Sequence, residues 1–278
     1  MTTQIEVSEF VKMYNEEGVR VLDGSWALDG SDMRKAFGEE HIPGAQFFDI
    51  DLVSNQTTKL PHMAPSTTQF AEAMQSLGMK TTDQVVVYDR QGLFSAARVW
   101  WTFTLMGHTN VRVLAGGLPA WKAQGLPVSN IVNSPKPSHY SAHLNGEIVI
   151  GFNELKAALE HHSSIILDAR PEARFSGAAP EPRPGLRSGH MPGAMSLPFT
   201  KLISEGRLKP KKDLDLLFDA YGITEKSSII TSCGSGVTAA IISMALCEVG
   251  HTQVRLYDGS WAEWGNPENC APIATGDS

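Results

Sequence analysis

The chain repeats its own sequence pattern once, and this repeat constrains the fold more than any other feature. Four blocks of the first half recur in the same order in the second half, displaced by 143 to 149 residues. The paired blocks are 21–23 with 166–168, 41–45 with 190–194, 85–89 with 229–233, and 107–111 with 250–254. Ordered blocks at a nearly constant displacement predict two domains of the same fold.

Each half alternates short apolar segments with amphipathic ones, which is typical of an α/β fold. Such alternation predicts a parallel sheet flanked by helices in each domain. The expected strands are 19–22, 85–88, 111–114, 165–167, 229–232 and 254–256. The expected helices are 67–77, 94–106, 152–161, 213–221 and 236–249, with Ser66 and Gln69 as a capping box.

The domain boundaries follow from a change of pattern in the middle of the chain. Residues 129–147 contain Ser-Pro-Lys-Pro-Ser and lack periodicity, so they are expected to form a linker. The predicted domains are therefore 1–128 and 148–278. Ligands of open parallel sheets bind at the carboxyl ends of the strands, where Asp89 and Cys233 fall.

Charge and cysteine content exclude several classes of function. The net charge of −7 argues against a nucleic-acid-binding surface. Three cysteines cannot build a disulfide framework, and their spacing fits no zinc site. No uncharged apolar run is long enough for a membrane span, and the first residues do not resemble a secretory leader. We therefore expect a cytoplasmic protein whose thiols stay reduced.

The strongest candidate for chemistry is the cysteine that ends one predicted strand. Residues 228–242 indicate a strand, a tight loop that begins at Cys233, and a helix. Backbone N–H groups of such a loop, together with the helix N-terminus, favour an anion at the cysteine sulfur. Cys233 is therefore predicted to be a nucleophile or to carry an anionic adduct, and the alternative is a buried structural cysteine. Cys247 is expected in the core, and Cys270 carries no motif.

The two halves differ at the position of this cysteine. The first half has Asp89 where the second has Cys233, so only the second domain is expected to carry the reaction. Asp89 is then a structural counterpart. The His-x-Pro-Gly-Ala blocks at 41–45 and 190–194 occur in both halves and are expected to mark a turn before a strand.

Arginines gather in the second half of an otherwise acidic chain. They are Arg170, Arg174, Arg183 and Arg187. Arginine offers bidentate donors that match a carboxylate, although any one of the four could be an ordinary surface residue. Arg183 lies between prolines, and this stiff segment favours a fixed position.

Several long motifs carry a resemblance to the rhodanese superfamily over nearly the whole chain. They are residues 40–45, 94–101, 181–185 and 257–261, together with the loop Cys-Gly-Ser-Gly-Val-Thr at 233–238. The resemblance implies two tandem rhodanese-like domains. The loop is similar to that of the 3-mercaptopyruvate sulfurtransferase family, whereas thiosulfate-using rhodaneses typically have Arg-Lys where this chain has Gly234 and Ser235.

The resemblance also implies roles for individual residues. Cys233 would accept sulfur as the nucleophile, Arg174 and Arg183 would bind the carboxylate and keto oxygen of the donor, and Ser235 would lie near the leaving sulfur. The other loop residues, Gly234, Gly236, Val237 and Thr238, would contact the substrate. His41 would reach the cleft with Asp32 as its partner, although a capping role for His41 is an equal alternative. The chemistry needs no metal or cofactor, and the acceptor would be cyanide or a thiol such as thioredoxin.

Three other functions remain as alternatives. A thiosulfate sulfurtransferase would favour cationic loop side chains, which Gly234 and Ser235 do not supply. A cysteine phosphatase on the same fold would need five residues between the cysteine and a phosphate-binding arginine, but only four separate Cys233 from Thr238, and Ala239 follows. A non-catalytic interaction module would have no need of Cys233 and the arginines.

Overall fold

The computed structural model describes residues 2–276 and divides the chain into two compact units. Unit 1 comprises Met1–Gln56, Ala64–Asn145 and Ser204–Leu208, and unit 2 comprises Thr57–Met63, Gly146–Ile203 and Lys209–Ser278. Most of the predicted linker thus lies in unit 1. Two short segments are exchanged between the halves: residues 57–63 belong to unit 2, and residues 204–208 belong to unit 1. The outer ends of the predicted domains, at residues 1 and 277–278, lie outside the described residues.

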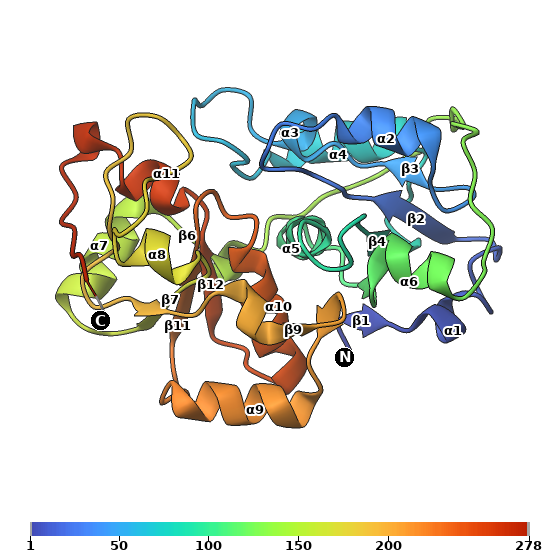
Figure 1. The fold of residues 1–278 in the computed structure, drawn as a ribbon. Coiled ribbons are helices and arrows are strands. Elements are labelled where there is room, and N and C mark those ends of the chain that lie inside the picture. The colour runs from blue at the N-terminus through green and yellow to red at the C-terminus, as the bar shows by residue number, and fades with distance from the viewer. Residues whose placement is uncertain (1, 277–278) are drawn as a thin grey trace. The chain divides into compact units, whose positions relative to one another are not determined.

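Unit 1 is built on a five-stranded sheet with the order β1-β5-β4-β2-β3, in which all neighbouring strands are parallel (Figure 1). Its strands are β1 (Gln4–Ile5), β2 (Val19–Asp23), β3 (Gln46–Phe47), β4 (Gln84–Tyr88) and β5 (Val111–Leu114). Its helices are α1 (Val7–Phe10), α2 (Met33–Glu39), α3 (Ile50–Val53), α4 (Thr67–Ser76), α5 (Ala96–Leu105) and α6 (Gly117–Ala123).

Unit 2 repeats this topology with the parallel order β6-β12-β11-β7-β8. Its sheet consists of β6 (Val149–Ile150), β7 (Ile165–Asp168), β8 (Met195–Ser196), β11 (Ile229–Ser232) and β12 (Val254–Tyr257). Its helices are α7 (Phe152–Glu160), α8 (Glu172–Phe175), α9 (Lys211–Ala220), α10 (Ala239–Val249) and α11 (Ser260–Trp264), with 3-10 turns η1 (Gly146–Ile148), η2 (Phe199–Leu202) and η3 (Pro267–Asn269). A separate two-stranded sheet consists of β9 (Ile203–Ser204) and β10 (Arg207–Leu208), and residues 204–208 of this segment belong to unit 1.

The predicted tandem α/β architecture is therefore confirmed, because the two sheets have the same strand order at corresponding positions of the repeat. All six predicted strands and five predicted helices are present within a few residues of their expected bounds. The edge strands β1, β3, β6 and β8 were not predicted, because strands of two residues are too short to show a periodicity.

Each unit has its own hydrophobic core cluster packed on its sheet. The core of unit 1 contains Phe10, Phe37 and Trp121, and that of unit 2 contains Tyr257, Trp261 and Trp264. The two tryptophans of unit 2 belong to the short helix α11. Packing of these large side chains, rather than helix propensity, holds a helix of only five residues in place.

The repeated His-x-Pro-Gly-Ala blocks form turns before the edge strands, as predicted. The N–H of Ala45 donates to the carbonyl of Ile42 at 3.0 Å, and that of Ala194 to the carbonyl of Met191 at the same distance. Gly44 and Gly193 adopt φ angles of 80° and 76°, which glycine tolerates without strain.

Three local expectations need correction. Ser66 caps α4 by accepting from the N–H of Gln69, but the Gln69 side chain donates to the carbonyl of Ser54 at 2.6 Å, so no reciprocal capping box forms. Helix α10 begins at Ala239 and not at residue 236, because φ of Gly236 is 76°. Cys247 is exposed on α10 and does not belong to the core.

The segment between the predicted domains has no helix or strand before Gly146, but side-chain contacts hold it against unit 1. Tyr140 is buried, and its hydroxyl lies 2.9 Å from Nδ1 of His108, whose Nε2 lies 3.0 Å from the carbonyl oxygen of Asp83. These contacts attach the end of the segment to unit 1.

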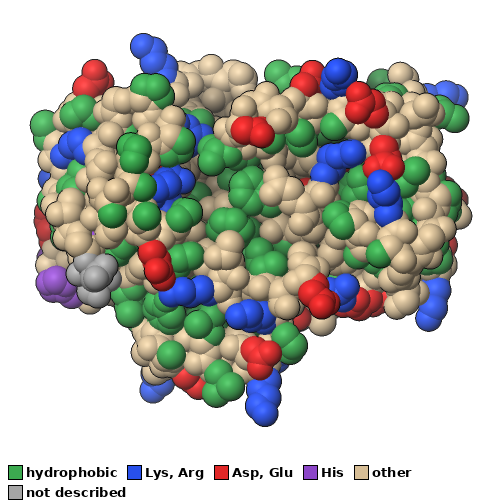
Figure 2. Space-filling model, in the orientation of Figure 1, with side chains coloured by type: hydrophobic (Ala, Val, Ile, Leu, Met, Phe, Trp, Pro, Cys, Tyr) green, Lys and Arg blue, Asp and Glu red, His purple; other side chains and the backbone are tan. Residues whose placement is uncertain are grey.

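The surface charges and the helices bear on nucleic-acid binding and membrane insertion, which the sequence disfavours. Figure 2 shows lysine and arginine side chains interspersed with aspartate and glutamate on the face drawn there. Among residues 2–276, no helix combines the length and apolar character that crossing a bilayer requires.

Candidate functional site

Cys233 lies at the carboxyl end of β11, at the centre of the sheet of unit 2. It begins a six-residue loop, 233–238, that leads directly into α10. The cysteine side chain is buried, as are Ser235 and Val237. The apolar β11 and the apolar first turns of α10 hold both ends of this loop rigidly, which suits a loop that must position one sulfur atom.

The start of α11 fixes the backbone at the cysteine. The N–H of Cys233 donates to Oγ of Ser260 at 3.2 Å, while the N–H of Trp261 donates to the carbonyl of Cys233 at 2.9 Å. The N–H of Ala262 donates in the same way to Gly234. Ser260 adopts a φ of 48°, an unusual angle that its position in this junction imposes. The sequence indicated that residues 257–261 matter but gave no sign of this anchoring role.

In the corresponding loop of unit 1, backbone N–H groups converge on a carboxylate. The carboxylate of Asp89, at the position equivalent to Cys233, accepts from the N–H groups of Gln91, Phe94, Ser95 and Ala96 at 2.7 to 3.0 Å. Asp89 is thus a structural residue, as predicted, because it occupies its own loop. Four donors converging on one carboxylate support the expectation that a loop of this kind stabilises an anion.

Two of the four arginines reach the loop 233–238. A Cβ atom at Gly234 would lie 3.0 Å from Nη2 of Arg174 and 3.6 Å from Nη1 of Arg183. Gly234 has no positive φ, so the need for glycine arises from the closeness of these guanidinium groups and not from a backbone angle. Both candidate clamp residues therefore converge on the residue next to Cys233.

The other two arginines serve the fold. Arg170 is buried, pairs with Asp168 through Nη2 at 2.7 Å, and stacks over the Trp261 ring at 4.2 Å. Arg187 donates to backbone carbonyls that include those of Gly265, Ala271 and Trp264.

Ser235 joins one clamp arginine to a histidine that the sequence did not suggest. Nη2 of Arg183 donates to Oγ of Ser235 at 3.1 Å, and Nδ1 of His62 lies 3.0 Å from the same oxygen. His62 is buried and has a φ of 61°, a conformation that a residue of this kind adopts at some energetic cost. It lies in no repeated block or recognisable motif, so only the fold could reveal it.

His41 and Asp32 have local roles in unit 1. The ring of His41 is buried and stacks on Phe37 at 4.1 Å, with Nδ1 2.7 Å from the Phe37 carbonyl and Nε2 3.2 Å from that of Ile131. Asp32 caps α2 by accepting from the N–H of Lys35. His190, the equivalent of His41 in unit 2, stacks on Phe175 in the same way. These contacts support the capping interpretation of His41.

The comparison with protein families agrees with the repeat. The model of the rhodanese-like domain matches residues 6–124 and again residues 152–267. The chain belongs to the rhodanese family. The matched regions contain all strands of the two parallel sheets except β1 and β6, and the second region contains Cys233, Arg174 and Arg183.

Characterised relatives match nearly the whole chain. The 3-mercaptopyruvate sulfurtransferase of Escherichia coli strain K12 is 41% identical over 250 residues, which cover 89% of each chain. A mitochondrial thiosulfate/3-mercaptopyruvate sulfurtransferase of Arabidopsis thaliana is 38% identical over 273 residues, covering 90% of this chain and 72% of the relative. The crystal structure of SseA from Escherichia coli, a 3-mercaptopyruvate sulfotransferase, superposes with a TM-score of 0.87 at 36% identity, covering 94% of this chain and 99% of SseA.

Proposed function

We propose that this rhodanese transfers sulfur from 3-mercaptopyruvate, through a persulfide on Cys233, to a thiol or cyanide acceptor. The observation that carries the proposal is the convergence of Arg174 and Arg183 on Gly234, beside a cysteine at the end of the central strand. Two guanidinium groups match the carboxylate and keto oxygen of a small α-keto acid. The similarity to the E. coli 3-mercaptopyruvate sulfurtransferase supports the choice of donor.

In the first half-reaction, the thiolate of Cys233 attacks the sulfur atom of the donor. The new S–S bond forms as the C–S bond of mercaptopyruvate breaks, and the bonding electrons leave with the carbon as the enolate of pyruvate. Arg174 and Arg183 stabilise this oxyanion, and the donors of the loop backbone stabilise negative charge on the persulfide. The enolate then takes up one proton to give pyruvate.

Ser235 and His62 are placed to supply that proton. Oγ of Ser235 accepts from Nη2 of Arg183 and, with its second lone pair, can accept from Nδ1 of His62 in the tautomer that carries a proton there, which leaves the hydroxyl proton free to point toward the substrate. We propose that this hydroxyl proton passes to the enolate carbon, that the proton on Nδ1 of His62 replaces it, and that His62 regains a proton from solvent. Such a relay acts at neutral pH without a metal or an organic cofactor.

In the second half-reaction, an acceptor thiolate or cyanide attacks the outer sulfur, and Cys233 leaves as the thiolate. A thiol acceptor such as thioredoxin and a cytoplasmic location belong to the proposal, because both suit a thiol that must remain reduced between turnovers.

The closest alternative donor is thiosulfate, which the name of the Arabidopsis relative includes. The loop of this chain offers no cationic side chain of its own to a dianion, since its residues are Cys-Gly-Ser-Gly-Val-Thr. This composition supports the preference for mercaptopyruvate.

The experiment that tests the proposal is a cyanolysis assay with each donor in turn. We expect thiocyanate from both donors, with a kcat/KM for mercaptopyruvate at least about tenfold above that for thiosulfate, a difference of about 1.4 kcal/mol in transition-state binding. Cys233→Ser serves as the control and should give no thiocyanate. A higher kcat/KM for thiosulfate would overturn the assignment of the donor, and no thiocyanate from either would overturn sulfur transfer itself.

A further inference from the structure

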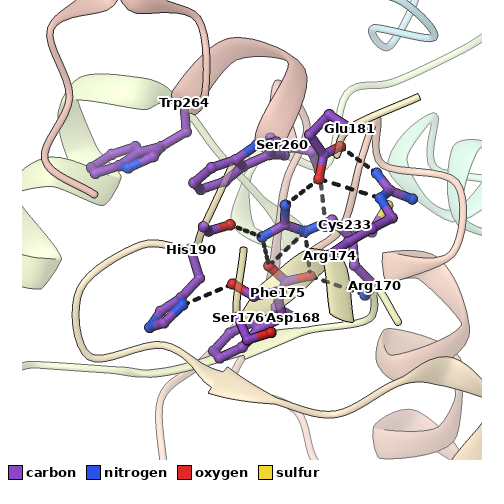
Figure 3. A network of polar contacts seen from close by, with 12 residues as sticks. Asp168, Arg170, Arg174, Phe175, Ser176, Glu181, His190, Cys233, Ser260 and Trp264 are labelled. Atoms are coloured by element: carbon purple, nitrogen blue, oxygen red, sulfur yellow. Dashed lines mark hydrogen bonds and ion pairs between the residues drawn. The ribbon is translucent and has the colours of Figure 1, made fainter. Parts of the chain in front are cut away.

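Glu181 is a buried carboxylate that joins two arginines of unit 2. Its side chain is 2% exposed. Nη1 of Arg170 donates to its Oε1 at 2.8 Å, while Nε and Nη2 of Arg174 donate to Oε1 and Oε2 at 3.2 and 2.5 Å. Figure 3 shows the carboxylate bonded to both guanidinium groups. None of the steps proposed above assigns a role to this residue.

The bond to Arg174 is side-on and fixes the orientation of its guanidinium group. The contact uses Nε and Nη2, and no residue in the described part of the chain accepts from Nη1. Nη2 itself lies next to Gly234. Glu181 therefore holds the plane of the guanidinium group and leaves donors for a ligand at the loop.

Glu181 also changes the charge that Arg174 presents. Arg170 pairs with Asp168 as well as with Glu181, so the network of Asp168, Arg170, Glu181 and Arg174 contains two acids and two bases. Their four formal charges cancel. Three of these side chains are at most 2% exposed, so salt and water screen the network weakly. Arg174 therefore approaches the loop as part of a network whose net formal charge is zero.

The repeat supplies an internal comparison for this network. In unit 1, Asp23 lies opposite Tyr88 in the sheet and accepts from the N–H of Ser25. In unit 2, the equivalent Asp168 lies opposite the smaller Ser232, and Arg170 stands at the position of Ser25. The arginine that anchors Glu181 is therefore particular to the unit that carries the cysteine.

We propose that Glu181 is a positioning residue that sets the charge preference for the sulfur donor. It aims Arg174 at the donor and cancels one positive charge, so the site favours a monoanionic α-keto acid over a dianion such as thiosulfate. The inference rests on the proposed function, because it concerns the choice between donors of the same transfer reaction.

The test is the substitution Glu181→Gln, which keeps the shape of the side chain and removes its charge. We expect the ratio of kcat/KM for thiosulfate to kcat/KM for mercaptopyruvate to rise about tenfold, mainly through a lower KM for thiosulfate. Glu172→Gln is the matched control, because it removes the same charge from an exposed residue of α8 that pairs with Lys201. This control should leave the ratio within about twofold of the wild type.

A second variant separates charge from packing. Glu181→Asp keeps the charge and withdraws the oxygens by one methylene, so KM should rise for both donors alike while the ratio between their kcat/KM values stays within about twofold. A folded Glu181→Gln variant with the wild-type ratio would overturn the proposal. So would a tenfold change of ratio in Glu181→Asp, which remains informative if Glu181→Gln does not fold. A wild-type enzyme that yields no thiocyanate from mercaptopyruvate would instead contradict the proposed function.

Discussion

Removal of Arg174 tests how much the guanidinium clamp contributes to sulfur transfer. In Arg174→Ala, the donor loses a charge-assisted contact at a side chain that is only 17% exposed, so little compensation from water is expected. Such contacts contribute about 1.5–3 kcal/mol. Since about 1.4 kcal/mol corresponds to a factor of ten, kcat/KM for mercaptopyruvate should fall roughly 10- to 150-fold. Arg174→Lys should recover only part of this loss, because lysine keeps the charge but not the fork of donors.

Thiocyanate formation under steady-state conditions measures the effect, and thermal unfolding monitors the fold. We expect the variant to fold, because Glu181 keeps its ion pair with Arg170 at 2.8 Å. Lys201→Ala is the control, since it removes a positive charge from an exposed pair in the same unit and should change kcat/KM less than about twofold. A folded Arg174→Ala enzyme with wild-type kinetics would refute the clamp.

Three further outcomes are expected. Ser235→Ala removes the hydroxyl that contacts Arg183 and His62, so kcat should fall at least about tenfold in the thiocyanate assay, and an unchanged kcat would exclude the proton relay. Replacing Gly234 and Ser235 with Arg-Lys should shift the kcat/KM ratio toward thiosulfate. Total activity should fall, because a side chain at position 234 crowds the guanidinium groups. A folded variant with an unchanged ratio would show that loop charge does not select the donor. Burial raises the pKa of Asp23 from its ordinary 3.8, so the folded state holds this proton more tightly and loses stability as pH rises above about 4. Asp23→Asn should therefore gain unfolding free energy relative to wild type between pH 4 and pH 8 in denaturant titrations, and a constant difference would contradict a raised pKa.

The repeat made the architecture predictable from the sequence. Two sets of apolar strands at a constant displacement required two similar sheets, and the switch from strand to helix after Cys233 located the loop. Where the structure differs from what the sequence predicted, the difference also has a physical cause. Cys247 sits in an apolar stretch of sequence, yet it lies in the last turn of α10, just beyond Leu246, where the burial that surrounds residues 239–246 of the helix ends.

The part of the site that depends on long-range packing could not be predicted. His62 meets Ser235 across 173 residues of sequence, and no local pattern encodes that contact. The histidine that did stand out, His41, is prominent because both halves need it for a turn. Among the arginines, the sequence could not separate Arg174 and Arg183 from Arg170 and Arg187 by spacing alone, and the motifs of the family made that distinction.

The sulfur carried by Cys233 is the central claim, and mass spectrometry of the intact and digested protein tests it most directly. After exposure to mercaptopyruvate without reductant, the peptide that contains Cys233 should gain the mass of one sulfur atom, and cyanide should remove it. Cys233→Ser should show no gain and no sulfur transfer, because a hydroxyl is a far weaker nucleophile toward sulfur. Sulfur found on the exposed Cys247 or Cys270, with Cys233 unmodified, would contradict the account.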